Sequence, residues 1–230
     1  YENRANISAS GSLELRNLTV GDSGQYTVII SPRQQPTQQG AATLNVYVPV
    51  SGIALSQPGG DLVEPSSSVR LSCSSSGSSI SFLWLNGTSS PSGRVHVADG
   101  GSALVVDNVT RYDQGPFRCH VFNPISNGTS DPVSLTINYG PEKVEIAGPP
   151  QIRLGQRLTL NCSAESEPAA GYKWTLGATE LSNSSELSFV VQKSSESGNY
   201  TCHAANSVTQ RTSSAVHALL VTEQSSLLRP

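Results

Sequence analysis

Few side chains in this sequence have the types and spacing that a reactive or metal-binding site requires. The cysteines are the first candidates, because cysteine can bind zinc or form disulfide bonds. Zinc sites usually draw on C-x-x-C clusters, whereas these cysteines fall into two well-separated pairs, which favours disulfides over a metal. The four are Cys73, Cys119, Cys162 and Cys202.

Histidine and aspartate, the other candidates, are scattered along the chain. The histidines lack an H-x-x-x-H pair and a nearby carboxylate set, and the aspartates lack the D-x-D spacing of a compact calcium site. They include His96, His120, His203 and His217, and Asp99, Asp107 and Asp113. The chain has no G-x-S-x-G, H-E-x-x-H, G-x-x-x-x-G-K or G-x-G-x-x-G motif. We therefore predict a protein that is not an enzyme, with no catalytic residue, metal site, cofactor or small-molecule substrate.

Eight asparagines lie in the Asn-x-Ser/Thr pattern that accepts N-linked glycans. With paired cysteines and only three lysines, this number indicates the secretory pathway and an oxidising compartment. We expect occupancy where the pattern falls in a predicted loop or at the end of a predicted strand. Those five sites are Asn17, Asn86, Asn108, Asn127 and Asn183, while Asn161 and Asn199 lie in predicted strands near a cysteine.

Charge and hydropathy exclude other classes of partner. A net charge of −3 and the absence of any Lys/Arg run argue against binding nucleic acid or an anionic membrane. No stretch reaches the roughly eighteen apolar residues of a membrane span, and the residues from Tyr1 onward do not have the basic and then apolar pattern of a leader. We expect any membrane attachment, and the true N-terminus, to lie outside this sequence.

The elements that must position the cysteines follow a repeat of about ninety residues. Each copy has an alternating apolar strand, a tight polar turn ending in Gly, and an aromatic residue two positions before a Cys or Val. The copies occupy residues 13–28, 104–119 and 187–202. Alternation with a period of two dominates the chain and no amphipathic helix is evident, so the fold class is all-β.

The spacing of Cys and Trp makes the fold specific. Trp84 and Trp174 follow the first cysteine of each pair by eleven or twelve residues. In an immunoglobulin sandwich, two cysteines bridge strands B and F, and the Trp of strand C packs over their bridge. The sequence therefore predicts tandem immunoglobulin-like β-sandwiches. The space between the cysteines admits strands C, D or C′, and E, as in constant or intermediate types.

The first repeat has no cysteine, and Val28 stands at the strand F position. We expect residues 1–48 to form strands D to G of a variable-like domain without a disulfide, with Arg4 and Asp22 as its salt bridge. The other predicted segments are residues 49–140 and 141–222, each a C2/I-type domain, and residues 223–230, a linker or tail.

A more specific resemblance is carried by residues 1–4, 17–19, 22–28, 94, 108–113, 123–126 and the Tyr139-Gly140-Pro141 junction. In these segments the chain resembles the carcinoembryonic-antigen-related cell adhesion molecules, as a distant, N-terminally truncated member. The sequence departs from the family at Phe117, which replaces the tyrosine of the strand F corner, and at the lead-in of residues 47–50.

The resemblance implies homophilic or heterophilic protein contacts through the C, C′, F and G sheet of the first domain. On this chain, that face comprises Thr27, Ile29, Ser31, Arg33, Gln35 and Gln39. Strand alternation independently predicts that Val28 and Ile30 point inward. The predicted function is cell adhesion by a cell-surface glycoprotein on the extracellular side of the plasma membrane. The alternatives are an immune or growth-control signalling receptor for a separate protein ligand, and a secreted form or decoy.

Overall fold

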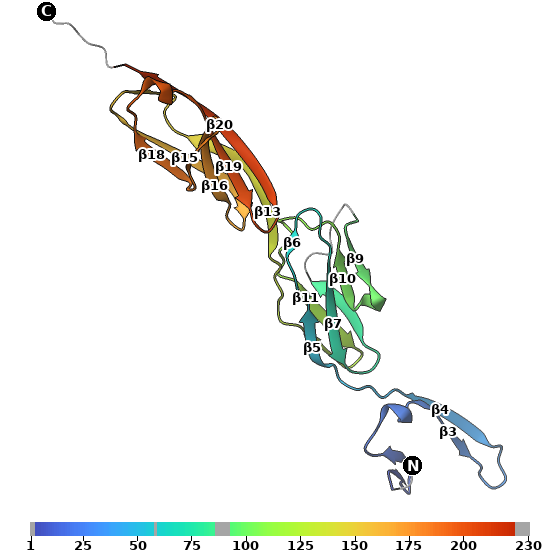
Figure 1. Cartoon of the computed structure of the whole chain (residues 1–230). Helices are drawn as coiled ribbons and strands as arrows, with labels where there is room; N and C mark the ends of the chain where they lie inside the picture. Colours follow the sequence, from blue (N-terminus) through green and yellow to red (C-terminus); the bar gives the residue numbers. More distant parts are fainter. Residues whose placement is uncertain (1–2, 58, 86–92, 224–230) are drawn as a thin grey trace, which may run out of the picture. The chain divides into compact units, whose positions relative to one another are not determined.

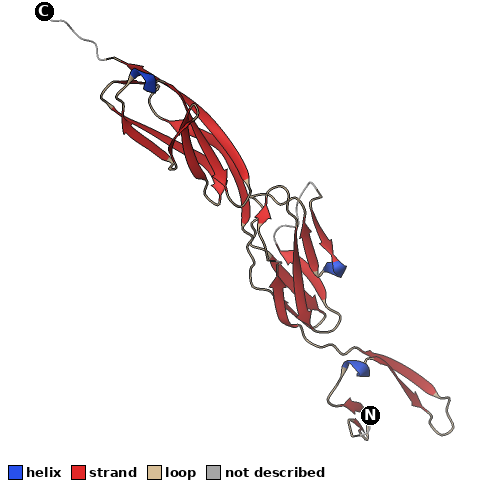
Figure 2. Cartoon of the chain, in the orientation of Figure 1, coloured by secondary structure: helices blue, strands red, loops and turns tan. Residues whose placement is uncertain are grey.

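The computed structural model describes residues 3–57, 59–85 and 93–223 (Figure 1). Within these residues, strands form nearly all of the regular structure, with three short 3₁₀ turns between them (Figure 2). The all-β prediction is confirmed. The chain divides into two compact units, residues 1–58, 70–106 and 115–134, and residues 59–69, 107–114 and 135–230. The predicted boundary at residue 140 lies inside one long strand, Ile137–Ala147, and it stays a prediction.

The first unit begins with two small antiparallel sheets. In one, β1 pairs with β2, and in the other β3 pairs with β4 over its whole length. A 3₁₀ turn, η1, leads into β3. The bounds are β1 Ala5–Ile7, β2 Leu13–Leu15, η1 Val20–Asp22, β3 Gly24–Ile30 and β4 Gln38–Leu44.

The rest of the first unit is a sandwich of two sheets, ordered β5-β7-β10-β9 and β12-β11-β8. This order corresponds to strands A-B-E-D and G-F-C of a constant-type immunoglobulin domain. The bounds are β5 Ser51–Ser56, β7 Val69–Ser76, β8 Ser81–Leu85, β9 Val95–Ala98, η2 Asp99–Gly101, β10 Ala103–Val106, β11 Arg118–Asn123 and β12 Ser126–Thr129.

The second unit contains a sandwich with sheets β18-β15-β13-β6 and β14-β20-β19-β16-β17. Here β17 pairs with β16 as a C′ strand, whereas the first unit's sandwich has a D strand, β9. The bounds are β6 Leu62–Val63, β13 Ile137–Ala147, β14 Gln151–Arg153, β15 Arg157–Glu167, β16 Gly171–Leu176, β17 Thr179–Ser182, β18 Glu186–Val190, η3 Ser194–Glu196, β19 Gly198–Asn206 and β20 Arg211–Thr222.

Alternation along the strands builds both cores. On β15, Leu158, Leu160 and Cys162 are buried, while the residues between them face outward at least in part. The same pattern on β7 buries Leu71 and Cys73. One face of each strand therefore supplies the core.

Candidate protein-interaction surface

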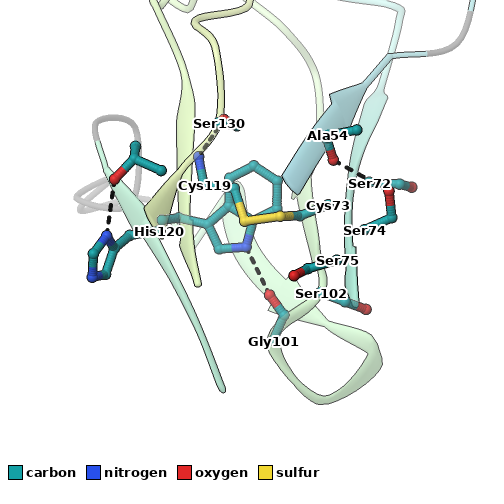
Figure 3. The surroundings of a disulfide bond; sticks show 12 residues. Ala54, Ser72, Cys73, Ser74, Ser75, Gly101, Ser102, Cys119, His120 and Ser130 are labelled. Atoms are coloured by element: carbon teal, nitrogen blue, oxygen red, sulfur yellow. Dashed lines mark hydrogen bonds between the residues drawn. A yellow bond between two sulfur atoms is a disulfide. The ribbon is translucent and has the colours of Figure 1, made fainter. Parts of the chain in front are cut away.

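The disulfides hold the centres of both sandwiches. Cys73 joins Cys119 across a separation of 46 residues, and Cys162 joins Cys202 across 40. Figure 3 shows the first bridge, with Gly101 accepting a hydrogen bond of 2.8 Å from the indole nitrogen of Trp84. Trp84 and Trp174 are 4% and 0% exposed. The structure thus places both predicted tryptophans in the cores beside the bridges.

A repeated turn positions the strand that follows it. Asp22 accepts hydrogen bonds from the backbone N–H and hydroxyl of Thr19, at 2.8 and 3.0 Å. Asp113 accepts the same pair from Thr110, at 2.7 and 2.8 Å. In the third copy, Glu196 accepts from backbone N–H groups. In every copy, the turn is therefore closed by an acidic residue that lies four positions before the aromatic residue of the repeat.

Arg4 and Asp22 lie together in the first repeat. The two guanidinium nitrogens of Arg4 bind the two carboxylate oxygens of Asp22, at 2.8 and 3.0 Å. Asp22 is only 4% exposed. The hydrogen bond from Arg4, followed by that from the Thr19 backbone, holds the pKa of Asp22 well below its ordinary range. The pair joins the chain before β1 to the turn that precedes β3.

Tyrosine hydroxyls close two of the corners. Tyr26 donates to the carbonyl of Asp22 at 2.7 Å, and Tyr200 donates to the carbonyl of Glu196 at 2.8 Å. Phe117, buried at the equivalent position, has no hydroxyl to donate. The Tyr26 bond was not foreseen, although its spacing from the acid matches that of Tyr200.

The predicted interaction face lies on the β3–β4 hairpin and the turn between its strands. Thr27, Ile29, Ser31, Arg33, Gln35 and Gln39 are all exposed. Ile29 is 64% exposed and lies opposite Gln39 in the strand register. Thr27 lies opposite Ala41. The structure brings Thr27, Ile29 and Gln39 onto one sheet, and Arg33 and Gln35 belong to the connecting turn.

The opposite side of this hairpin is apolar and open. It borders a cavity lined by Leu13, Leu15, Leu18, Tyr26 and Val28, among others. Val28 and Ile30, which were expected to point inward, are 53% and 54% exposed. Val28 lines this cavity and so lies on the predicted inward side, but the described residues cover that side only in part.

In each sandwich, one asparagine side chain forms hydrogen bonds with the segment through which the chain enters the sandwich. The side-chain amide of Asn123 donates to the carbonyls of Val48 and Ser78, and its oxygen accepts from backbone N–H groups of the following turn. Asn206, 2% exposed, donates to the carbonyl of Tyr139 in the same way. Sequence reasoning missed this role. The signal was available, because each Asn follows its strand F cysteine by four residues.

Arg111 forms a charged cluster within the second compact unit. Its guanidinium binds Glu64 and Glu142, each at 2.9 Å, and stacks 3.9 Å above the centre of the Tyr139 ring. Glu165 lies 3.8 Å away. Burial disfavours the charged guanidinium, but the hydrogen bonds to Glu64 and Glu142 outweigh this effect and raise the pKa of Arg111. These partners lie far apart in sequence, so no local pattern predicts the cluster.

The glycan acceptors that the structure describes are at the surface. Asn17, Asn108, Asn127 and Asn183 are exposed, and Asn86 lies outside the described residues. Asn17 and Asn108 have left-handed backbones with φ of 51° and 48°, a conformation that Asn tolerates. The sequence predicts loops at Asn86, Asn127 and Asn183, and for Asn127 this is wrong, because pairing with β11 places it on β12.

In the described part of the chain, no group of three or more His, Cys, Asp or Glu side chains could hold a metal ion. The same residues include no helix long and apolar enough to cross a membrane.

Comparison with known proteins decides the family. Residues 61–132 and residues 143–220 each match a family model described as an immunoglobulin domain. The chain belongs to the immunoglobulin superfamily. Both matches contain one of the disulfide-linked Cys pairs described above.

Two solved structures show the same fold over most of the chain. A three-domain structure of titin I67–I69 matches with a TM-score of 0.63 and 20% identity, over 95% of this chain and 81% of that one. The mouse nectin-like molecule 4 ectodomain matches with a TM-score of 0.57 and 22% identity, over 94% and 79%. Murine CEACAM1b is 26% identical over 58% of this chain and 68% of that one, with a TM-score of 0.49.

Proposed function

We propose that this immunoglobulin-superfamily chain is part of a cell-surface glycoprotein that mediates adhesion between cells through the β3–β4 face. We assign it to the carcinoembryonic-antigen-related molecules as a distant member, on the sequence motifs quoted above. The exposed face centred on Ile29 carries this proposal. The two disulfide-linked sandwiches serve as glycosylated spacers.

The chemistry of this face suits a protein partner. Its paired strands place Ile29 beside Gln39 and Thr27 beside Ala41, with no charged side chain among them. The centres of protein interfaces are depleted of charged residues, because an unpaired charge is costly to desolvate. Ile29 offers a β-branched apolar side chain that a partner can cover. Arg33, in the turn, would lie at the polar rim.

Weak contacts of this kind hold cells together when many of them form at the same time. Many copies on opposed membranes convert a modest pairwise affinity into avidity, because each further contact forms at a high effective concentration. A second copy of the same face is the simplest partner, since two neutral faces do not repel one another.

Cell aggregation tests the proposal. The full-length product is expressed on non-adherent cells, alone and mixed with unlabelled cells that lack it. We expect clumps of expressing cells only, and we expect Ile29→Asp to abolish them because it places a charge at the centre of the face. Val97→Asp is the matched control, since Val97 is a β-branched strand residue, 51% exposed, on β9 of the first unit's sandwich and outside the β3–β4 hairpin. Antibody staining must show equal surface amounts.

The outcomes separate the candidate functions. Clumping that survives Ile29→Asp would reject this face. Clumps that recruit cells lacking the protein would indicate a heterophilic ligand. Absence of clumping in both mixtures would reject adhesion and favour a signalling receptor or a secreted decoy.

A further inference from the structure

The hairpin of β11 and β12 carries a glycan acceptor directly opposite an exposed aromatic ring. Asn127 on β12 pairs with Phe122 on β11, and Thr129 of the same acceptor pattern pairs with His120. Residues directly opposite on antiparallel strands have their Cβ atoms about 5 Å apart and on the same side of the sheet. Asn127 and Thr129 are exposed, and Phe122 is 40% exposed.

The outer side of this hairpin is separate from the core. Val121, between the two aromatic residues, is fully buried and pairs with Gly128, where an added Cβ would meet the Ile53 side chain at 2.6 Å. The residues on either side of Val121 and Gly128 must therefore point outward. The acceptor asparagine and the aromatic rings consequently share one solvent-facing surface.

The two aromatic rings on this surface are stacked and together form a platform on which a sugar ring can pack. The His120 and Phe122 rings are stacked, with centroids 5.9 Å apart and planes 26° from parallel. A hydrogen bond of 2.9 Å between His120 Nδ1 and Thr129 Oγ1 fixes the histidine ring (Figure 3). An aromatic face carries negative charge density, and it attracts the slightly positive C–H bonds on one face of a pyranose ring.

We propose that Asn127 carries an N-linked glycan whose first N-acetylglucosamine lies across Phe122 and His120. The sugar covers apolar ring surface that otherwise faces water, and it stabilises the hairpin by linking its strands through the side chains. This inference rests on the proposed extracellular function, because acceptor asparagines are glycosylated in the secretory pathway.

Other acceptors in paired strands lack this arrangement. Asn6 lies opposite Glu14, Asn161 lies opposite Glu186 and Ala147, and Asn199 lies opposite Ala218. None of the three has an aromatic partner across the strand. Asn199 is therefore a matched control, since it is an exposed strand asparagine whose glycan would have no ring to cover.

The test uses the whole chain secreted from mammalian cells. Glycopeptide mass spectrometry measures occupancy at Asn127, and thermal unfolding is compared for the wild type, Asn127→Gln, Phe122→Thr and the double variant. We expect Asn127→Gln to lower the midpoint of the affected transition by about 4 °C when Phe122 is present and by less than about 1 °C in Phe122→Thr. Asn199→Gln should shift the midpoint equally in both backgrounds.

A second readout is independent of stability. In NMR spectra of glycosylated protein, ring currents should move the protons of the first sugar at Asn127 upfield, and Phe122→Thr should return them to ordinary positions. The wild type without its glycan should remain monomeric in sedimentation.

Each other result overturns the inference. An unmodified Asn127 in a protein that is glycosylated elsewhere rejects this site and leaves the proposed function intact. If Asn127 carries a glycan but Asn127→Gln lowers the midpoint equally with and without Phe122, the proposed packing of the sugar on the rings is rejected. Self-association on losing the Asn127 glycan would assign the rings to a protein partner instead. A chain with no acceptor occupied would count against the proposed function as well.

Discussion

Replacing Tyr200 with Phe tests the energetic role of the corner hydrogen bond. The Tyr200 side chain is fully buried, and its hydroxyl donates to the Glu196 carbonyl at 2.8 Å. Burial, and secondarily Glu196, raises the pKa of Tyr200, so the hydroxyl keeps its proton and remains a donor at neutral pH. Tyr200→Phe removes this bond and leaves the ring in place.

The expected cost follows from the geometry. A neutral hydrogen bond contributes about 1 kcal/mol net, and the freed carbonyl is at a partly exposed residue where water can replace the hydroxyl. For a domain of this size, roughly 1 kcal/mol corresponds to a fall of about 5 °C in midpoint. Differential scanning calorimetry of the whole chain should show one transition shifted and the other unchanged.

A matched substitution in the same sandwich controls for loss of a hydroxyl. Tyr172 also packs against this core, but its hydroxyl makes no hydrogen bond within the described residues. Tyr172→Phe should leave the midpoint within about 1 °C of the wild type. If Tyr200→Phe behaved like Tyr172→Phe, the corner bond would contribute nothing and the reasoning would be refuted.

Three further predictions concern the disulfide, the arginine cluster and the buried carboxylate. Replacing Cys73 and Cys119 with Ala should destabilise the first unit's sandwich by about 4 kcal/mol in the chain-entropy treatment, and an unchanged unfolding midpoint in denaturant would contradict this. Arg111→Lys should lower the free energy of unfolding by about 2 kcal/mol, because an ammonium group cannot reproduce the planar guanidinium and its stacking on Tyr139. Calorimetry measures this loss, and an unchanged midpoint would show that the cluster does not stabilise the fold. Since the folded pKa of Asp22 is depressed, its stabilisation is present above about pH 4 and is lost as pH falls through the folded pKa. Carboxyl NMR titration should show this, and Arg4→Gln should move the Asp22 pKa back toward its ordinary value.

Local patterns in the sequence predicted the fold class well. The spacing of cysteine, tryptophan and a second cysteine predicted two sandwiches, because only strands B, C and F at those positions bring the three side chains together. The repeated polar turn, followed by an aromatic residue, identified the start of strand F in each copy. Such short-range relations can be read directly from the chain.

Local patterns failed where burial depends on another element. Val28 and Ile30 alternate correctly for an inward strand face, yet both are about half exposed because the described residues cover that side only in part. Asn127 has the composition of a loop residue, but pairing with β11 makes it part of a strand. Alternation predicts which side of a strand is apolar, while only a partner element determines whether that side is buried.

The sequence by itself determined the all-β class, the disulfide pairs with their tryptophans, and the repeated polar turn that precedes each strand F. Only the tertiary structure decided that Arg111 meets Glu64, Glu142 and Tyr139, and that Phe122 faces Asn127. The physical reason is distance along the chain. Period-two alternation and turn chemistry act between near neighbours, whereas strand register and charged clusters depend on how the connecting segments bring remote residues together.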